Sequence, residues 1–417
     1  MRISKHFLVI FALLFSITPA HAAEVPIEFN FQGTGYGHGV GLSQIGARGK
    51  ALNGEQAQSI LTYYYSGSQI LPMTDNQNIR VNVGHLLTQA TLKSGTQGST
   101  LNLYMSDVGE DLAAIPVASL SSRSGISFVQ QGSSISAFSV TGKNSQLIGT
   151  SSSWSARWSG TRYLDGAPST VSLKINSKSV KYRYGQIQVK SVKAPLIGHR
   201  MEITNTVRIH DEYLYGISEV PSSWPTQALI AQAIASRSYA LSKLGIPKTA
   251  CDCNVYNNIS DQAFVGFSKE GEARYGQLWK AAVDATAVDA DNGLALTIDG
   301  APISVFFSSS TGGATQRAVD VWGTDIPHLL SVPDPWSIDP AINKNYASWT
   351  KKVSQKAMAK AFGLPDVERY EIVSRTATNS VLFITGFSSS GQAKTLPVAT
   401  LKTAVKLPSS WFDLPIS

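Results

Sequence analysis

The hydrophobic pattern divides this 417-residue chain into a strand-rich stretch and a mixed remainder. From residue 78 to about residue 206, apolar and polar positions alternate in short runs separated by Gly, Ser and Asn, which is typical of strands and turns. The predicted strands in this stretch are residues 79–83, 100–105, 126–130, 170–175, 181–192 and 201–205. Residues 151–159 are rich in serine but carry two tryptophans, which predicts a loop that packs against the protein.

A helix is predicted over residues 226–241, where an alanine-rich run allows close backbone packing. Pro225 suits the first helical position because its missing N–H would have no partner there, and Ser222 or Ser223 can cap the exposed amides. Other predicted helices are residues 54–65, 277–288 and 353–362, and other predicted strands are residues 294–298, 303–307, 370–374 and 380–386. The pattern predicts one strand-rich α+β architecture, with the helix after Pro225 packed centrally.

The N-terminal residues have the pattern of a secretory signal peptide. Arg2 and Lys5 precede an apolar run at residues 7–17, and residues 20–22, Ala-His-Ala, form a small-x-small cleavage site. The apolar run is shorter than the roughly 20 residues that a membrane-spanning helix needs. We therefore expect a mature protein that begins near Ala23, has no transmembrane segment and is secreted into the cell wall or periplasm.

The net charge of +7 favours acidic partners such as nucleic acid, anionic lipid or a cell-wall polymer. Export argues against nucleic acid, and the lack of a basic run predicts a dispersed charge. Only two cysteines occur, Cys251 and Cys253, and their redox state stays open between thiols, a disulfide and an intermolecular link. Zinc is disfavoured because two cysteines without a nearby histidine supply half of a tetrahedral site.

Residues 33–49 contain seven glycines and one histidine, so the backbone there must turn sharply or approach another group closely. A phosphate-binding loop is disfavoured, because the glycines from Gly35 to Gly41 alternate strictly and no Lys-Ser/Thr follows.

Glu219 is the leading candidate for chemistry, because it lies between apolar residues just before a helix. Burial against Val220 and Trp224 would raise the pKa of this carboxyl, whereas the helix N-terminus would lower it. A raised pKa would suit a general acid. The alternative is that Glu219 only caps the helix or pairs with Arg237.

Two segments resemble the SpoIID/LytB family of bacterial proteins that act on peptidoglycan. Residues 213–241 resemble the family's tyrosine-leucine entry, Ser-Glu-hydrophobic-Pro turn, Ser-Trp-Pro and alanine-rich helix. Residues 37–47, GHGVGLSQIGA, followed by the helix end at residues 60–67, resemble a second family motif. Supporting matches are residues 255–256, 310–313, 321–323, 327–329 and 335–336, so that the resemblance covers most of the chain.

The order of the motifs differs from the family, in which the glycine–histidine segment lies near the C-terminal end. Residues 396–412 resemble the stretch that normally precedes that segment. The resemblance therefore implies a circular permutation, which is feasible when the chain termini are close together. It predicts that Ser417 lies near the mature N-terminus and that His38 reaches the same cleft as Glu219.

The resemblance also implies a division of the chain into a signal peptide and parts of a SpoIID-like architecture. The expected segments are residues 1–22 as signal peptide, 23–70 as the permuted glycine–histidine segment, 71–206 as a β-rich region, 207–345 as the catalytic core and 346–417 as the C-terminal part of the same domain.

The implied activity is cleavage of peptidoglycan glycan strands, free of stem peptides, by a lytic transglycosylase mechanism. Glu219 would protonate the glycosidic oxygen and then act as base while the muramoyl C6 hydroxyl attacks C1. Such intramolecular attack needs no second carboxylate to activate water. The resemblance places substrate contacts at His38, Ser43, Gln44, Gln232, Arg237, Ser310 and Thr311. Trp224, Trp322 and Trp336 are candidates for stacking on sugars, although tryptophans more often belong to the core.

Some members of the family hold zinc through a His and a Cys three residues apart, and here those positions are Ser308 and Thr311. No metal or other cofactor is therefore implied. A second hypothesis is a noncatalytic protein that binds the cell wall or enhances a partner amidase. A third is a structural envelope protein, for which the polar positions of the helix would have no purpose.

Overall fold

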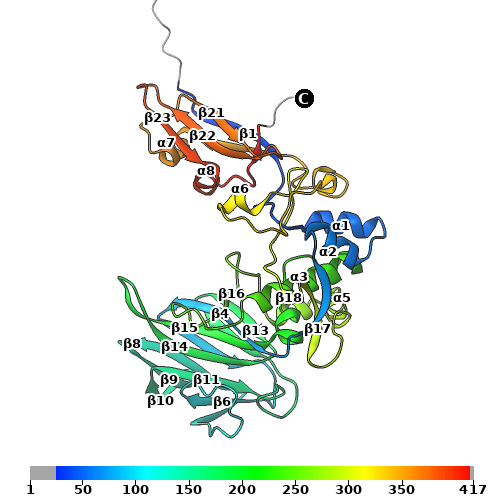
Figure 1. The fold of residues 1–417 in the computed structure, drawn as a ribbon. Helices are drawn as coiled ribbons and strands as arrows, with labels where there is room; N and C mark the ends of the chain where they lie inside the picture. The colour runs from blue at the N-terminus through cyan, green and yellow to red at the C-terminus, as the bar shows by residue number, and fades with distance from the viewer. Residues whose placement is uncertain (1–24, 414–417) are drawn as a thin grey trace, which may run out of the picture. The chain divides into compact units, whose positions relative to one another are not determined.

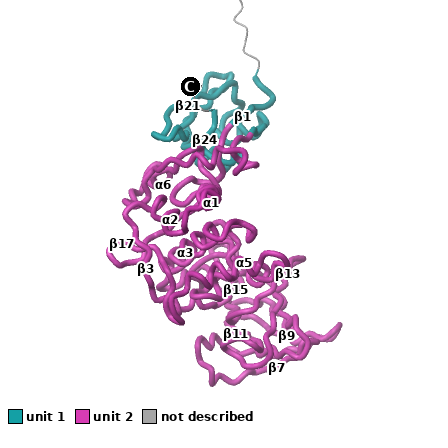
Figure 2. Tube along the Cα trace, turned by 90° about the vertical axis from the view of Figure 1, so that its right-hand side faces the viewer, with its two compact units in different colours: residues 1–32, 350–417 teal, residues 33–349 magenta. Residues whose placement is uncertain are grey.

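The computed structural model describes residues 25–413 (Figure 1). The predicted signal peptide, residues 1–22, and Ser417 lie outside these residues. Within the described residues the chain forms two compact units, residues 25–32 with 350–413 and residues 33–349 (Figure 2). Within the described part of the chain, no helix has the length and apolar character needed to cross a membrane.

In the first unit the first and last described strands of the chain are neighbours in one sheet. Its sheets have the strand orders β20-β1-β24 and β21-β22-β23. Asp413 N donates to Gln32 O at 2.7 Å, and the ring of Phe31 packs against Tyr370 and Phe412 at 5.2 and 5.3 Å. The unit's elements are β1 (Glu28–Thr34), β20 (Trp349–Ser354), α7 (Gln355–Phe362), β21 (Arg369–Arg375), β22 (Val381–Phe387), β23 (Ala393–Pro397), α8 (Val398–Val405) and β24 (Trp411–Phe412). Adjacent ends are what a permutation requires, and the permutation itself stays a prediction.

The second unit contains two antiparallel sheets that share one hydrophobic core (Figure 1). One has seven strands in the order β16-β4-β15-β14-β11-β6-β7, and the other has six in the order β10-β9-β8-β5-β12-β13. All their pairings are antiparallel except the parallel pair β16–β4. Their bounds are β4 (Asn78–Leu87), β5 (Gln89–Ser94), β6 (Thr100–Met105), β7 (Ala118–Ser121), β8 (Gly125–Gln131), β9 (Ser134–Thr141), β10 (Asn144–Ser151), β11 (Ser153–Trp158), β12 (Val171–Ile175), β13 (Lys178–Tyr182), β14 (Gln186–Ala194), β15 (Gly198–Arg208) and β16 (Val255–Tyr256).

The predicted strands of this region are confirmed, except that residues 181–192 contain parts of two strands, β13 and β14. The loop predicted at residues 151–159 is wrong, because β11 lies there, between β14 and β6. Trp154 and Trp158 are fully buried in the core. Serine misled the prediction because a strand can accommodate it when the hydroxyl is satisfied, as Ser155 Oγ is by Ser106 O at 3.0 Å.

The helices of the second unit surround α3 (Thr226–Ser242), which contacts α1, α2, α5 and β17. The other elements are β2 (Leu42–Ser43), α1 (Gln44–Leu52), α2 (Ala57–Tyr64), β3 (Gln69–Thr74), α4 (Phe267–Glu270), α5 (Gly276–Asp284), β17 (Asn292–Ile298), β18 (Ala301–Pro302), β19 (Phe307–Ser308), α6 (Ala318–Trp322) and the short turns η1 (Ile209–Tyr213) and η2 (Pro335–Ile338). The described structure is α+β, as predicted.

Two local predictions around these elements are wrong. Pro225 is the N-cap residue of α3 and no side chain caps the helix; the Ser222 hydroxyl is buried without a hydrogen-bond partner among the described residues. Proline's fixed backbone therefore starts the helix without serine's help. Residues 303–306 are irregular where a strand was predicted, and only Phe307 and Ser308 pair, in parallel with β2.

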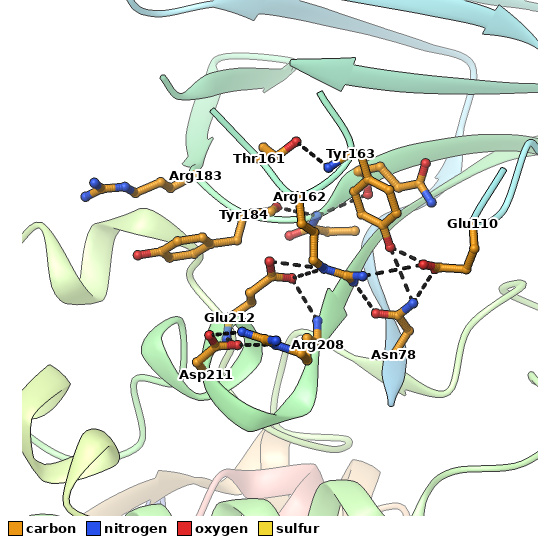
Figure 3. A network of polar contacts seen from close by, with 12 residues as sticks. Asn78, Glu110, Thr161, Arg162, Tyr163, Arg183, Tyr184, Arg208, Asp211 and Glu212 are labelled. Atoms are coloured by element: carbon orange, nitrogen blue, oxygen red, sulfur yellow. Dashed lines mark hydrogen bonds and ion pairs between the residues drawn. The ribbon is translucent and has the colours of Figure 1, made fainter. Parts of the chain in front are cut away.

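A polar network joins the β-rich region to the turn η1 that leads toward Glu219 (Figure 3). Arg162 contacts the Glu212 carboxylate at 3.2 Å and the Glu110 carboxylate at 3.4 Å. Glu212 also accepts a hydrogen bond from Arg208 N at 2.9 Å. Burial raises the pKa of Glu212, and the charge of Arg162 opposes that rise. The network therefore fixes the start of the segment that carries the candidate acid.

Trp154 tests how far the shared core of the two sheets stabilises the protein. Its indole Nε1 donates to Ile135 O on the six-stranded sheet at 2.9 Å. Trp154→Ala should lower the free energy of unfolding by about 3–5 kcal/mol, because it leaves a cavity and an unpaired carbonyl. Chemical denaturation measures this change. Leu112→Ala, at a residue that is 67% exposed, is the control and should cost less than about 0.5 kcal/mol.

Candidate active site

The loop that carries Glu219 is held by the backbone of residues 263–265. Ser218 N donates to Ala263 O at 2.8 Å, and Val265 N donates to Gly216 O at 2.8 Å. Ala263 N in turn donates to Glu219 Oε1 at 2.6 Å. The direction of the carboxyl is therefore fixed by main-chain bonds on both sides.

Neither alternative role of Glu219 is found in the structure. No side chain caps α3, and Arg237 pairs with Asp75 instead, through Nε to Oδ2 at 2.6 Å. Both side chains of that pair are fully buried. Arg237 also donates to Thr286 Oγ1 at 2.7 Å and to Leu294 O at 3.1 Å, so it belongs to the packing of α3 against β17.

Burial raises the pKa of Glu219, as a general acid requires. Three interactions oppose the rise: the hydrogen bond from Ala263 N, a hydrogen bond from the Gln44 side chain and the positive charge of Lys269. A carboxyl with these surroundings keeps its proton to higher pH than an exposed one and still has partners for its ionised form.

Glu219 lines a cavity of about 660 Å³ together with His38 and Gln44. The glycine–histidine segment and the Glu219 loop are 181 positions apart in sequence (219 minus 38), yet they form walls of one cavity. Trp322 lies on the same cavity and is 42% exposed, with its ring 5.1 Å from that of His38. The cavity thus combines a protonatable acid, an imidazole, an amide and an aromatic face.

Gln44 connects the cavity to the helix α3. Its Nε2 donates to Gln232 Oε1 at 3.3 Å, and Gln232 Nε2 donates to Ser236 Oγ at 3.1 Å. Gln232 is buried behind Gln44 and does not line the cavity. Gln232 and Ser236 of α3 are therefore connected through Gln44 to Glu219, with which the Gln44 side chain forms a hydrogen bond.

The other residues expected at the site lie away from the cavity. Ser43 caps α1 by accepting from Gly46 N at 3.0 Å, and it bonds to Ser337 Oγ at 3.0 Å. Thr311 Oγ1 donates to Asp334 Oδ2 at 2.7 Å. Ser310 is fully buried, with no hydrogen-bond partner for its hydroxyl among the described residues. The bonds of Ser43 and Thr311 are therefore to other parts of the protein, and none of the three residues lines the cavity.

Of the three tryptophans considered for stacking, the structure places only Trp322 on a cavity that Glu219 lines. Trp224 is half-buried beside the larger core, with the Arg48 guanidinium 6.0 Å from its ring. Trp336 packs beside Lys50, whose Nζ is 4.6 Å from its ring.

Sequence reasoning missed a second carboxylate on the cavity, Asp261. Tyr239 OH donates to Asp261 Oδ1 at 2.7 Å, and Oδ2 accepts from Tyr256 N at 2.8 Å and Lys248 Nζ at 3.1 Å. The cavity therefore has two carboxylates, Glu219 and Asp261. No periodic pattern points to Asp261, because it lies in an irregular loop.

A second cavity, of about 780 Å³, shares Glu219 with the first. Lys269, Glu272 and Asn257 are among its polar lining residues. Glu219 is therefore accessible from two cavities.

The positions considered for metal carry other bonds. Ser308 Oγ accepts from Gly39 N at 3.2 Å, and Thr311 bonds to Asp334. Cys251 and Cys253 form a disulfide. Among residues 25–413, no group of three or more His, Cys, Asp or Glu side chains is placed to hold a metal ion.

Residues 198–290 match the model of the SpoIID family, described as Stage II sporulation protein. The match contains Glu219, α3 and the 263–265 backbone that holds the Glu219 loop. Over these residues the chain is similar to the SpoIID family. The family resemblance inferred from residues 213–241 is therefore confirmed, whereas the glycine–histidine segment lies outside the matched residues and the permutation stays a prediction.

The curated relatives match this chain over about a third of its length. The amidase enhancer of Bacillus subtilis (strain 168) is 30% identical over 141 residues, which cover 34% of this chain and 16% of that protein. Stage II sporulation protein D of the same organism is 31% identical over 135 residues, and that of Bacillus amyloliquefaciens is 32% identical over 135 residues. Each of these two matches covers 30% of this chain and 38% of the relative. The chain thus spans less than two fifths of each relative.

Gly41 tests whether the glycines shape the cavity wall. It has a φ of +73°, and a Cβ there would lie 2.1 Å from Phe306 O. Gly41→Ala should destabilise the protein by about 3 kcal/mol or more, through backbone strain and the clash. Gly54→Ala is the matched control, since Gly54 has a φ of +87° with nothing within 4 Å of a Cβ. That control should cost about 1 kcal/mol in chemical denaturation, and equal losses would contradict the argument.

Proposed function

We propose that this protein cleaves peptidoglycan glycan strands by a lytic transglycosylase mechanism, on glycan poor in stem peptides. The observation that carries the proposal is the Glu219 carboxyl, which burial keeps protonated to higher pH and which main-chain bonds aim at a cavity. The SpoIID-family segment and its relatives support a cell-wall-related role. The predicted export of the chain would bring it to that substrate.

In the proposed mechanism Glu219 acts twice. Its proton passes to the oxygen between N-acetylmuramic acid and N-acetylglucosamine as that bond breaks. The resulting Glu219 carboxylate accepts the proton of the muramoyl C6 hydroxyl, while the oxygen of that hydroxyl forms a bond to C1. The product has a 1,6-anhydro end. Gln44 and Ala263 N, which hydrogen-bond the Glu219 carboxyl, stabilise it in its ionised state.

The surroundings of Asp261 favour this intramolecular route over hydrolysis. A paired-carboxylate glycosidase needs its second carboxylate to activate water or to attack the sugar. Both oxygens of Asp261 already accept hydrogen bonds, from Tyr239, Tyr256 N and Lys248. Asp261 therefore shapes the loop at the cavity and leaves Glu219 to transfer the proton.

The substrate contacts that the geometry favours are those on the cavity with Glu219. Trp322 offers a ring face for a sugar, and His38 and Gln44 offer polar groups for hydroxyl or acetamido groups. Ser43, Gln232, Ser310, Thr311 and Arg237 are not among the residues that line this cavity. No metal or cofactor enters the proposed reaction.

A second candidate function is the enhancement of a cell-wall amidase without cleavage. The observation in its favour is the relative named amidase enhancer. The same cavity would then bind glycan, and the proton on Glu219 would have no role.

Glu219→Gln separates the two functions. It keeps the acceptor for Ala263 N but removes the proton donor, so the cleavage rate should fall at least about 100-fold. Mass spectrometry of fragments from purified glycan strands, with and without stem peptides, measures the 1,6-anhydro ends. Glu272→Gln, on the neighbouring cavity, is the control and should retain activity.

Other outcomes of this experiment have defined meanings. Reducing ends in place of anhydro ends would establish hydrolysis and overturn the proposed mechanism. No product from the unmutated protein, together with faster release of stem peptides by an added amidase, would support the enhancer function.

Trp322→Ala tests the sugar-stacking face. Loss of the ring should raise KM for glycan strands roughly 3- to 10-fold while kcat changes little. Steady-state kinetics on soluble glycan fragments measure both constants. Trp224→Ala, at a residue off both cavities, should leave KM unchanged in the fraction of protein that folds, and an equal effect on KM would contradict a stacking role for Trp322.

A further inference from the structure

Lys269 occupies an unusual position for a lysine, because it is buried and contacts the residue that follows the candidate acid. It lies on α4 and is only 4% exposed, although it lines the second cavity beside Glu219. Its Nζ donates to Val220 O at 2.6 Å and lies 5.3 Å from the centre of the Trp279 ring. Lysine is rarely buried unless its charge has a partner.

The partner of Lys269 is a backbone carbonyl. Within residues 25–413, no carboxylate lies within 4.0 Å of its ammonium group. Glu272 and Glu219 act on it from longer range and raise its pKa, against the larger lowering by burial. A salt bridge therefore does not account for the burial of this lysine, whereas a bond to the residue that follows Glu219 does.

We propose that Lys269 is a positioning residue for Glu219, which holds the Val220 carbonyl and places a positive charge at the cavity that the carboxyl also lines. This inference rests on the proposed function of Glu219. Ala263 N holds the carboxylate oxygen and Lys269 holds the backbone on the C-terminal side of the same residue. Together the two bonds limit the directions that the side chain can take.

The charge of Lys269 also matters for a group that must act as acid and then as base. It lowers the pKa of Glu219 and so opposes the rise from burial. Removing the charge would raise that pKa further, so the protonated form would persist to higher pH. The alkaline limb of the rate profile, where the acid loses its proton, would then move to higher pH.

Other titratable groups near Glu219 do not supply this charge. Tyr213 and Tyr239 feel its charge, but burial raises their pKa values and keeps both phenols neutral. Asp261 and His38 line the first cavity with Glu219. Lys269 is the residue whose charge lowers the pKa of Glu219.

The test compares Lys269→Met, Lys269→Gln and Lys269→Arg. Methionine keeps the apolar stem but removes donor and charge, so kcat should fall about 10-fold or more through misplacement of Glu219, with little change in KM. Its alkaline limb should also move to higher pH. Glutamine should restore part of kcat but keep the shifted limb, and arginine should restore both. The measurement is the rate of anhydro-end formation from denuded glycan across pH.

Lys280→Met is the matched control. It removes one positive charge from the neighbouring helix α5, where Lys280 pairs with Asp284 at 2.8 Å and lines neither cavity. This variant should keep the unmutated rate and pH profile. Thermal unfolding of each variant establishes that the folded fractions are equal.

A direct titration makes the inference testable even if the protein cleaves nothing. Carbon-13 NMR of the Glu219 carboxyl, assigned with Glu219→Gln, should show a higher pKa in Lys269→Met than in the unmutated protein. The role of Lys269 would be overturned if the Glu219 pKa were the same in Lys269→Met and in the unmutated protein. It would also be overturned if Lys269→Met lost rate but its alkaline limb stayed at the same pH. Absence of cleavage together with a shifted titration would instead overturn the proposed function alone.

Discussion

The hydrogen bond from Ala263 N to Glu219 is the interaction on which the site depends. A buried carboxyl without a hydrogen-bond donor would lose its hydrogen bonds to water, and no bond within the protein would replace them. Ala263 N supplies that donor at 2.6 Å, and the paired backbones of residues 216–218 and 263–265 hold it in place. Burial can then raise the pKa of the carboxyl without making its ionised form inaccessible.

The rest of the second unit can be understood as support for that bond. The sandwich of β-sheets fixes Glu212 through Arg162, so the chain enters the Glu219 loop from a rigid turn. The helix α3 leaves the loop and connects to Gln44 through Gln232. The acid therefore lies on irregular backbone between two regular regions, where a side chain can be both aimed and accessible.

Much of this arrangement follows from sequence patterns. The alternation of apolar and polar residues predicted the strands of the β-rich region, and the proline before an alanine-rich run predicted α3. Glu219 stood out because it is a carboxylate among apolar residues, and its raised pKa agrees with that environment. These features are local, so neighbouring residues along the chain determine them.

The wrong or absent predictions concern residues whose structure depends on contacts with distant parts of the sequence. Serines at 153 and 155 suggested a loop, but hydrogen bonding to other strands allows them in the middle of a sheet. Arg237 resembled a partner for Glu219, yet Asp75, 162 positions away, holds it. Lys269 and Asp261 have no motif, and their proximity to Glu219 arises only when the loops fold together.

The pairing of early and late segments has a kinetic consequence. β1 lies between β20 and β24, and β2 pairs with β19, so strands made first must wait for partners made hundreds of residues later. Closing such long loops is slow, and the waiting segments stay unpaired meanwhile. The wall formed by the glycine–histidine segment therefore lacks its strand pairing until residues 307–308 have been made. Assembly of the Glu219 cavity is a late event in the life of this chain, which keeps an incomplete chain from presenting a finished site.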